Sequence, residues 1–431
     1  MPYWLIVVAV LSMAVVALLL VLLLFEPGLA YKATAPDVPV DSDAFLCVLG
    51  ALVDAEVHDY ERVEVPTNGD VFYEAELAAI RAATSTVHME RYIFAKGDVA
   101  KRYVDALAER ARAGVRVKLV LDYIGSFSTW DAYLEPLRAA GGQVCWYQPV
   151  SLANAKRFNN RTHRELLVVD GKVGFVGGAG VADWWFRGEP KKPQWRDTMF
   201  RLEGDILLGL QTTFAENWLE SSGEILPGDA DHFPACRGDG WATDRKGESG
   251  LVVISSPGAG RATRARILFQ VLLASATRTI DITTPYFLPD RSAIREMVRA
   301  VKERGVRVRI LVPGEHADHL MTRRAGRRRY GPLLEAGAEI HEYGPSMIHA
   351  KILVVDGVWC VFGTANFDNR SFGLNDEVNV AINDRELAER LAADHAADLS
   401  RSHRVTLEEW RRRPLTERVV EWASRVLERQ S

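Results

Sequence analysis

The stretch His349-Ala-Lys-Ile-Leu-Val-Val-Asp356 has a near copy 186 residues earlier, His163-Arg-Glu-Leu-Leu-Val-Val-Asp170. A second pair of segments repeats at almost the same interval, because 112–121 and 303–312 read nearly alike. The equivalent glycines of that pair, Gly114 and Gly305, are 191 residues apart. Two copies of one structural unit therefore make up the body of the chain.

The order of elements within each copy predicts the fold class. An apolar, aromatic strand (91–94 and 285–288) is followed by an amphipathic helix (100–112 and 292–304), a second strand, and a further helix and strand. Strands that alternate with helices indicate βαβ units and a largely parallel sheet. We therefore expect an α/β protein with two homologous α/β/α sandwich halves related by a pseudo-twofold.

The length of 431 residues suits two domains of ordinary size, and changes in composition suggest their limits. We expect a membrane anchor at 1–25, a Pro-containing linker at 26–66, a first half at 67–235, a linker at 236–250, a second half at 251–400 and a C-terminal amphipathic helix at 401–431.

The N-terminal segment predicts a membrane anchor. Residues 3–25 contain no charged side chain, and as a helix they would extend roughly 34 Å, enough for a hydrocarbon core of ~30 Å. A cleavable signal peptide is the competing interpretation, since 28–30 reads small-x-small. The absence of Lys or Arg before the apolar run, and the length of the run, favour an uncleaved single-pass anchor. Almost no basic residues flank the run, so its orientation stays open.

The repeated motif places two functional side chains together. On a strand, His349 and Lys351 project to the same face, while Ala350 points away. An imidazole can act as nucleophile or proton donor near neutral pH without a metal. A neighbouring ammonium group offers positive charge for phosphate oxygens. The pattern therefore indicates chemistry at a phosphate group.

The second copy reads H-x-K-x4-D over 349–356 and continues as Gly363-Thr-Ala-Asn366. These residues resemble the motif of the phospholipase D superfamily, and the resemblance covers about residues 67–400. Within that superfamily, 195–198, the strand 284–287 and the N-terminal apolar segment are similar to bacterial cardiolipin synthases.

The resemblance implies roles for the motif residues. His163 and His349 are expected to share one catalytic site, with Lys351 and Asn366 binding the substrate phosphate. It also implies catalytic roles for Lys351 and for the motif aspartates, Asp170 and Asp356. No metal and no cofactor are expected.

A carboxylate follows each motif at a similar interval. Asp197 comes 34 residues after His163, and Glu377 comes 28 residues after His349. The resemblance implies that each carboxylate accepts a hydrogen bond from a catalytic imidazole and fixes its tautomer.

The first motif departs from the pattern, because Glu165 stands where the second motif has lysine and Gly180 stands where it has Asn366. A carboxylate facing a phosphate would repel it unless the carboxylate is protonated or paired. Lys351 is the expected partner. Arg164 points to the opposite face, whereas Arg161 shares the face of His163 and could supply a cation.

Three functions fit these observations. The first is a membrane-bound phosphatidyltransferase like cardiolipin synthase, which joins two phosphatidylglycerols through a phosphohistidine and releases glycerol. The second is a phospholipase or nuclease that uses water as acceptor. The third is a catalytically degenerate lipid-binding protein, which the residues at 165 and 180 would explain. The aromatic run 184–186 is either an interfacial loop or part of the core.

The composition bounds the partners. A net charge of −4 and a pI near 6.2 argue against a nucleic-acid partner. Four scattered cysteines give neither a zinc site nor a disulfide framework. We therefore expect an anionic phospholipid substrate and a location at the cell membrane.

Overall fold

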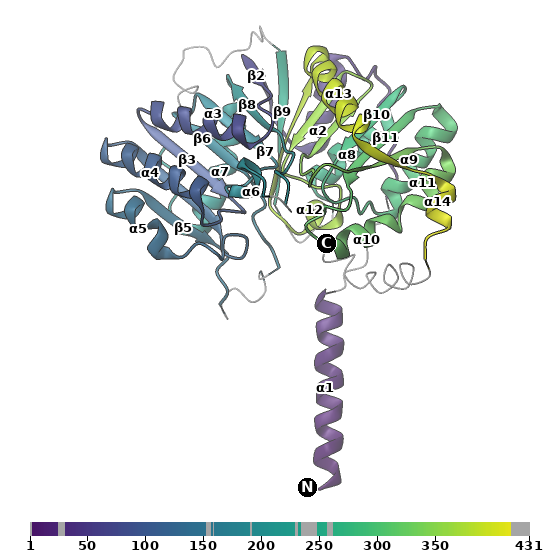
Figure 1. The fold of residues 1–431 in the computed structure, drawn as a ribbon, viewed down its shortest axis with the longest axis horizontal. Helices are drawn as coiled ribbons and strands as arrows, with labels where there is room; N and C mark the ends of the chain where they lie inside the picture. Colours follow the sequence, from purple (N-terminus) through teal and green to yellow (C-terminus); the bar gives the residue numbers. More distant parts are fainter. Residues whose placement is uncertain are drawn as a thin grey trace.

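The computed structural model describes residues 2–24, 31–151, 157, 159–189, 192–228, 232–233, 248–256 and 262–414. Two β-sheets, one of seven and one of nine strands, lie side by side, and each carries helices (Figure 1). The α/β class and the division into two homologous halves are confirmed.

The first half is built on the seven-stranded sheet. Its strands, in spatial order, are β2 (Arg62–Glu64), β8 (Met199–Glu203), β7 (Val173–Gly177), β6 (Leu166–Val169), β3 (Thr86–Arg91), β4 (Arg116–Asp122) and β5 (Gln143–Tyr147). Its helices are α3 (Gly69–Ala82), α4 (Asp98–Arg112), α5 (Asp131–Ala139), α6 (Asp183–Phe186) and α7 (Leu207–Ser222).

The second half is built on the nine-stranded sheet. Its strands, in spatial order, are β1 (Val57–Tyr60), β9 (Glu248–Ser255), β15 (Glu377–Asn383), β14 (Trp359–Gly363), β13 (Ile352–Val355), β10 (Thr279–Thr283), β11 (Arg307–Pro313), β12 (Glu339–Tyr343) and β16 (Ser402–Val405). Its helices are α2 (Asp43–Val53), α8 (Arg264–Ser275), α9 (Arg291–Arg304), α10 (Leu320–Arg327), α11 (Tyr330–Ala336), α12 (Asn369–Gly373), α13 (Arg385–Ser400) and α14 (Leu407–Arg411).

The sheets are mixed, which corrects the expectation of largely parallel sheets. In the first half only the pairs β3–β4 and β4–β5 are parallel, and in the second half only β10–β11 and β11–β12 are. The motif strands β6 and β13 run antiparallel to β3 and β10. Strands alternate with helices only at the start of each repeat, and there the strands are parallel as predicted. Later strands are joined by tight turns and reverse direction.

Repeated local signals shape equivalent elements in the two halves. Asp290 caps the start of α9 by accepting hydrogen bonds from the backbone N–H groups of Ser292 and Ala293. That helix ends at Gly305, which adopts a left-handed conformation with φ of 69°. Gly114, at the equivalent turn after α4, has φ of 90°. A residue with a Cβ would be strained at both turns, which explains why the repeat keeps glycine there.

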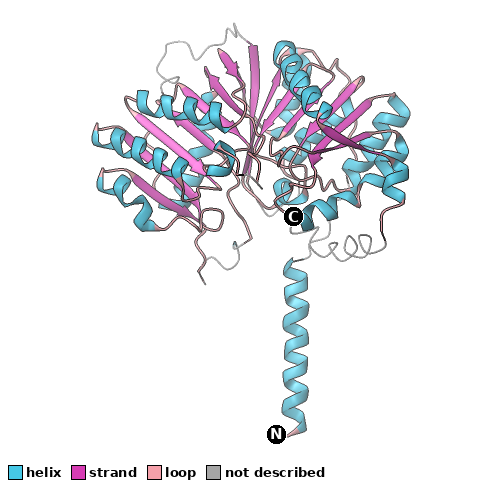
Figure 2. Ribbon diagram, viewed as in Figure 1, coloured by secondary structure: helices cyan, strands magenta, loops and turns pink. Residues whose placement is uncertain are grey.

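Each half has a core between its sheet and outer helices. In Figure 2, helices cover the outer side of both sheets. Side chains of α3 and α4 pack on the seven-stranded sheet, and those of α2, α8 and α9 pack on the nine-stranded sheet. A third cluster joins strands of the two halves, with the rings of Phe200 and Phe362 stacked 3.7 Å apart between centroids. This shared cluster holds the halves together.

Residues 31–66 are part of the folded body, so the expected linker at 26–66 is wrong for these residues. Helix α2 buries Phe45, Leu49 and Val53 in the core of the second half. Strand β1 pairs with β9, and β2 pairs with β8. These elements were hard to predict because they are short and scattered among prolines. Their stability comes from contacts with distant segments.

The N-terminal helix α1 (Tyr3–Leu24) has 22 residues without an Asp, Glu, Lys or Arg. It projects from the side of the body on which α10 and α12 lie (Figure 1). Among the described residues, no helix is both long enough and apolar enough to cross a bilayer. The side chains of residues 17–24 are not among those described.

Two further predicted segments lie partly outside the described residues. Most of the expected linker 236–250 is one of them, although residues 248–250 already belong to β9. Of the expected C-terminal helix at 401–431, residues 402–405 form β16, which pairs with β12, and 407–411 form α14. The prediction of a helix is therefore wrong for residues 402–405, whereas residues 407–411 are helical and residues 415–431 lie outside the described part.

Candidate active site

The two motif histidines lie where the halves exchange backbone hydrogen bonds. The N–H of His163 donates to the carbonyl of Asp376 at 2.9 Å, and the N–H of His349 donates to the carbonyl of Arg196 at 2.7 Å. Each histidine thus pairs with the residue directly before the carboxylate of the other half. This reciprocal arrangement is what a pseudo-twofold produces, and it builds one site from both repeats.

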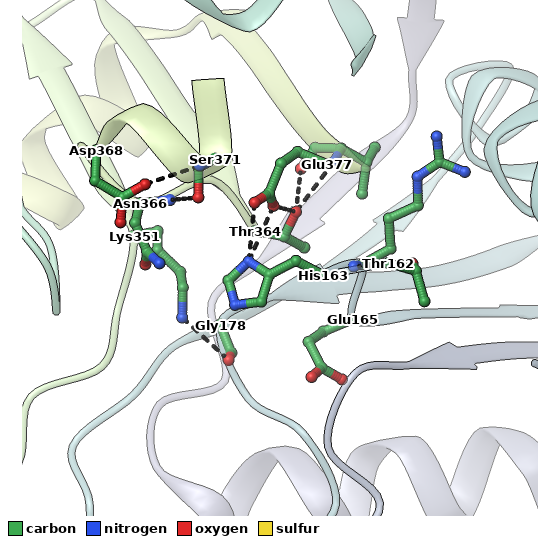
Figure 3. Close-up of polar contacts among 12 residues, drawn as sticks. Thr162, His163, Glu165, Gly178, Lys351, Thr364, Asn366, Asp368, Ser371 and Glu377 are labelled. Carbon is green, nitrogen blue, oxygen red and sulfur yellow. Dashed lines mark hydrogen bonds and ion pairs between the residues drawn. The ribbon is translucent and has the colours of Figure 1, made fainter. Parts of the chain in front are cut away.

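The carboxylates reach the imidazoles crosswise. His163 Nδ1 lies 3.0 and 3.1 Å from the two carboxylate oxygens of Glu377, and His349 Nδ1 lies 3.1 Å from Asp197 Oδ2 (Figure 3 shows the first pair). The resemblance described above implied both carboxylates as hydrogen-bond partners of the imidazoles. The crossing itself depends on how the halves dock, so the order of residues along the chain does not reveal it.

Glu377 determines which nitrogen of His163 is available for chemistry. The Thr364 hydroxyl donates to Glu377 Oε2 at 2.5 Å, and the carboxylate is fully buried. Because a carboxylate only accepts hydrogen bonds, Nδ1 of His163 carries the proton that it donates to Glu377. Nε2 of the neutral ring then keeps a free electron pair, which a nucleophile requires.

His349 has a different environment. Its Nδ1 lies 2.8 Å from Lys351 Nζ as well as 3.1 Å from Asp197 Oδ2. Nδ1 cannot serve both, because Asp197 requires a proton on it and an ammonium group requires an electron pair. Burial, reinforced by the charge of Lys351, lowers the pKa of His349, and the hydrogen bond to Asp197 opposes that shift.

Aromatic rings enclose His349. The rings of Trp185 and Trp195 each lie 5.4 Å from its imidazole between centroids. Trp185 is fully buried and donates from Nε1 to Asp197 Oδ2 at 3.0 Å. The run 184–186 is therefore core at Trp185, and the interfacial-loop interpretation is wrong for that residue. The sequence could not show that this indole donates a hydrogen bond to the carboxylate that contacts His349.

Lys351 and Asn366 lie together in the second half. Lys351 Nζ donates to the carbonyls of His349 at 3.0 Å and Gly178 at 3.3 Å, and burial lowers its pKa. Asn366 is 4 % exposed, and its Oδ1 has no hydrogen-bond partner among the described residues. A buried amide without a partner is costly, so the side chain is suited to a ligand. Both residues remain our predicted phosphate-binding groups.

Asp368 is a site residue that sequence reasoning missed. It lies two residues after Asn366, and Figure 3 shows it beside Asn366 and Ser371. Its Oδ1 accepts a hydrogen bond from the N–H of Ser371 at 2.8 Å. Burial raises its pKa to about 6. Its position two residues beyond the motif asparagine was the available signal.

Glu165 is buried and lies beside Arg91, not paired with Lys351. It is 3 % exposed, with Oε2 3.7 Å from Arg91 Nη1 and Oε1 accepting from the N–H of Ile93 at 3.2 Å. Among the described residues, no ion pair joins Glu165 to Lys351, and the polar contacts of Lys351 are to His349 and Gly178. Burial raises the pKa of Glu165 to about 8 against the opposing effect of Arg91.

The two arginines of the first motif are also engaged. Arg164 points away from His163, as expected, and donates to the carbonyl of Thr213 at 2.8 Å. Arg161 Nε lies 3.1 Å from Asp122 Oδ2, and Nη2 donates to two backbone carbonyls. Arg161 is 2 % exposed, so it does not supply a free cation in place of the missing lysine.

Three replacements in the first half cluster in space. Strands β3 and β10 pair with the motif strands in the same register, which makes Arg91 the counterpart of Thr284. The first half therefore has Arg91, Glu165 and Gly180 where the second has Thr284, Lys351 and Asn366. A Cβ at Gly180 would lie 3.1 Å from Glu165 Oε1 and 2.6 Å from the Ile93 carbonyl oxygen. The Ile93 backbone therefore leaves no room for a side chain at position 180 unless it shifts, and Glu165 borders the same space.

The motif aspartates do not belong to the site, which corrects their predicted catalytic role. Asp170 accepts hydrogen bonds from the N–H groups of residues 84–86, and Asp356 accepts them from the N–H groups of residues 277–279, all at 2.7–2.8 Å. Each lies seven residues beyond its histidine, about 23 Å along an extended chain. They fix the turns that lead into β3 and β10.

The described residues contain no group of three His, Cys, Asp or Glu side chains that could hold a metal ion. The polar groups at the site are instead two imidazoles, two carboxylates, an ammonium and an amide, a set suited to acid–base chemistry on a phosphate ester.

Comparison with known proteins places this arrangement. The chain matches the family described as "Cardiolipin synthase, PLD-like domain" over residues 77–189 and 270–399. It is 35% identical to the major cardiolipin synthase of Bacillus subtilis (strain 168) over 367 residues, which are 85% of this chain and 74% of that protein. It is 33% identical to a cardiolipin synthase of Geobacillus kaustophilus over 365 residues, 84% of this chain and 71% of that protein.

Solved structures share the fold. The phosphatidylserine synthase of Haemophilus influenzae Rd KW20 superposes with a TM-score of 0.65 at 15% sequence identity, covering 88% of this chain and 98% of that one. The polyphosphate kinase from Porphyromonas gingivalis superposes with a TM-score of 0.55 at 11% identity, covering 84% of this chain and 53% of that one.

Proposed function

The chain belongs to the phospholipase D superfamily as a phosphatidyltransferase of the cardiolipin synthase type, and we propose that it works through His163 as nucleophile and His349 as acid and base. The observation that carries this assignment is the difference between the two imidazoles. Among the described residues, Nδ1 of His163 contacts only the carboxylate oxygens of Glu377, whereas Nδ1 of His349 lies within reach of both Asp197 and Lys351.

The first half-reaction forms a phosphohistidine. Nε2 of His163 attacks the phosphorus of one phosphatidylglycerol, and the bond from phosphorus to the glycerol oxygen breaks. His349 gives that oxygen a proton, so glycerol leaves as the neutral alcohol. The negative charge of a bound phosphodiester raises the pKa of His349 and opposes the effect of burial. Glu377 stabilises the positive charge that develops on His163.

The second half-reaction transfers the phosphatidyl group. A hydroxyl group of a second phosphatidylglycerol attacks phosphorus while neutral His349 takes its proton, and the bond from phosphorus to Nε2 of His163 breaks. Cardiolipin leaves and both histidines return to their starting states. Lys351 and Asn366 hold the non-bridging oxygens throughout, and the first half contributes no second lysine.

Helix α1 is the proposed single-pass membrane anchor. Its 22 uncharged residues extend about 33 Å as a helix, close to the thickness of a hydrocarbon core. An anchor keeps the site near lipids that are insoluble in water, which a transfer between two lipids requires.

The proposal is tested with the full-length protein in vesicles that contain phosphatidylglycerol. We expect equal amounts of cardiolipin and free glycerol, and we expect His163→Gln to abolish both while His58→Gln, a substitution on β1, leaves them unchanged. Phosphatidic acid as the main product would support the alternative of a phospholipase that uses water. Lipid binding without any product would support the catalytically degenerate alternative.

A further inference from the structure

Apolar side chains are exposed on one loop of each half. After β4, Phe127 is 73% exposed and Trp130 is 72% exposed. After β11, Leu320 is 51% exposed and Met321 is 41% exposed. Strands β4 and β11 are equivalent strands of the repeat, 191 residues apart, so the two exposed apolar groups follow equivalent strands in the two halves.

Both loops lie at the edge of the sheets where the catalytic histidines lie. Strands β3, β4 and β5 are parallel, so their carboxyl ends share one edge, and β10, β11 and β12 behave likewise. The motif strands β6 and β13 run in the opposite direction and begin at those edges. His163 and His349 stand just before these strands. The pseudo-twofold therefore places the apolar loops on either side of the site.

The N-terminal segment leaves the body at the same edge. The Tyr31 hydroxyl donates to Asp290 at 2.8 Å, and its backbone N–H donates to the Ser292 hydroxyl at 3.2 Å. Asp290 caps α9 shortly after the carboxyl end of β10. Seven residue steps separate Leu24 from Tyr31, so this edge stays within about 25 Å of the end of α1.

Exposed cations accompany the apolar groups. Arg324 on α10 is exposed, whereas Arg323 and Arg327 of the same helix pair with Glu342 at 2.7 and 3.0 Å. Lys96, in the loop after β3, is exposed as well. Aromatic and aliphatic side chains beside cations are typical of protein surfaces that enter the headgroup region of a bilayer.

We propose that Phe127 and Trp130 in the first half, with Leu320 and Met321 in the second, form a bilayer-facing surface that inserts into the membrane interface around the active site. This bilayer-facing surface extends the proposed function, because it rests on the membrane anchor. Helix α1 alone would tether the body without orienting it, whereas this surface would turn the active site toward the lipid headgroups. Because the surface lies on both sides of the active site, its insertion would point the pseudo-twofold axis toward the membrane.

The experiment compares one double variant with a matched control in full-length protein. Phe127→Ser/Trp130→Ser removes two exposed apolar side chains from the surface. Ile225→Ser removes an apolar side chain that is 77% exposed but lies away from the proposed surface. Its neighbour Glu224 pairs with Lys118, which is in the amino-terminal half of β4, whereas the surface follows the carboxyl end of that strand. Cardiolipin formation is measured on phosphatidylglycerol in vesicles and on a short-chain phosphatidylglycerol dissolved as monomers.

We expect the double variant to lose about tenfold or more of its rate on vesicles and none on the monomeric lipid, with Ile225→Ser unchanged on both. Equal rates of the double variant and the wild type on vesicles would overturn the proposal, and so would equal losses on both substrates.

A second measurement does not depend on catalysis, so it separates failure of this proposal from failure of the proposed function. Lipids brominated in the upper part of their acyl chains quench a tryptophan that enters the interface. In the full-length protein Trp130→Phe should reduce this quenching relative to wild type, with Trp4 contributing equally to both. Identical quenching in the wild type and in Trp130→Phe would overturn the proposal. So would a double variant that changes its oligomeric state but is quenched as strongly as the wild type.

Discussion

Glu165→Gln tests the unusual first half of the site. The carboxylate is 3 % exposed, and burial raises its pKa to about 8 from an ordinary value of 4.5. Between these two values the folded protein holds a proton on Glu165 that the unfolded chain has lost. Folding stability of the wild type therefore falls as pH rises through this window. Glutamine does not titrate and keeps the shape of the protonated acid.

The magnitude follows from the width of the window. Each pH unit is worth about 1.4 kcal/mol, so Glu165→Gln should gain about 1.4 kcal/mol of stability relative to wild type per pH unit between about pH 5 and 8. The full window corresponds to roughly 5 kcal/mol. Arg91 keeps Glu76 as a partner at 2.5 Å, so its charge is not left unpaired by the substitution.

The assay is denaturant unfolding followed by near-ultraviolet circular dichroism at several pH values. Glu74→Gln, on an exposed face of α3, removes the same group without burial and should show no such slope. A stability difference that stays constant between about pH 5 and 8 would refute the reasoning, because it would mean that Glu165 is already ionised in the folded protein and held by Arg91. Loss of transferase activity in a stable Glu165→Gln protein would show instead that the carboxylate transfers a proton.

Three further outcomes are expected. Lys351→Ala should lower the transfer rate about 10²–10³-fold, because no second lysine shares its role, and Lys172→Ala on the turn after β6 should not, as steady-state kinetics on phosphatidylglycerol would show. Asp356→Asn should lower the thermal midpoint by several degrees while the fraction that remains folded keeps its specific activity, since the carboxylate binds backbone N–H groups of the turn before β10. Deletion of residues 1–24 should leave the thermal midpoint of the body unchanged, whereas deletion of residues 1–54 should lower it markedly, because α2 buries apolar side chains in the second half.

The sequence was informative where the signal is local and repeated. The duplicated motif identified both halves and placed His163, His349 and Lys351 at one predicted site. The resemblance that the motif carries also implied Asp197 and Glu377 as hydrogen-bond partners of the imidazoles, and a carboxylate does follow each histidine at a similar interval. Strand alternation correctly predicted that Arg164 points to the face opposite His163, as its hydrogen bond to the Thr213 carbonyl shows.

The sequence failed where a role depends on docking. Asp170 and Asp356 repeat as faithfully as the histidines, yet their carboxylates bind turns at the far ends of the strands. A repeated residue can serve the fold as well as the reaction, and spacing alone does not separate the two. Arg91 was missed as the neighbour of Glu165 because Arg91 ends β3 and Glu165 directly precedes β6, far away in the chain. Helix α2 was recognised only as a short element, since its partners α8 and β9 are more than 190 residues away.

The central claim is that His163 forms the covalent bond to phosphorus. The direct test mixes full-length protein with phosphatidylglycerol and denatures it within one turnover at mildly alkaline pH, where the bond from phosphorus to histidine nitrogen survives. Mass spectrometry of peptides then locates the modified residue. A phosphatidyl group on His163 of the wild type that is absent from His163→Gln is the predicted result. A phosphatidyl group on His349 instead would contradict the assignment of nucleophile and acid that the contacts of Glu377, Asp197 and Lys351 support.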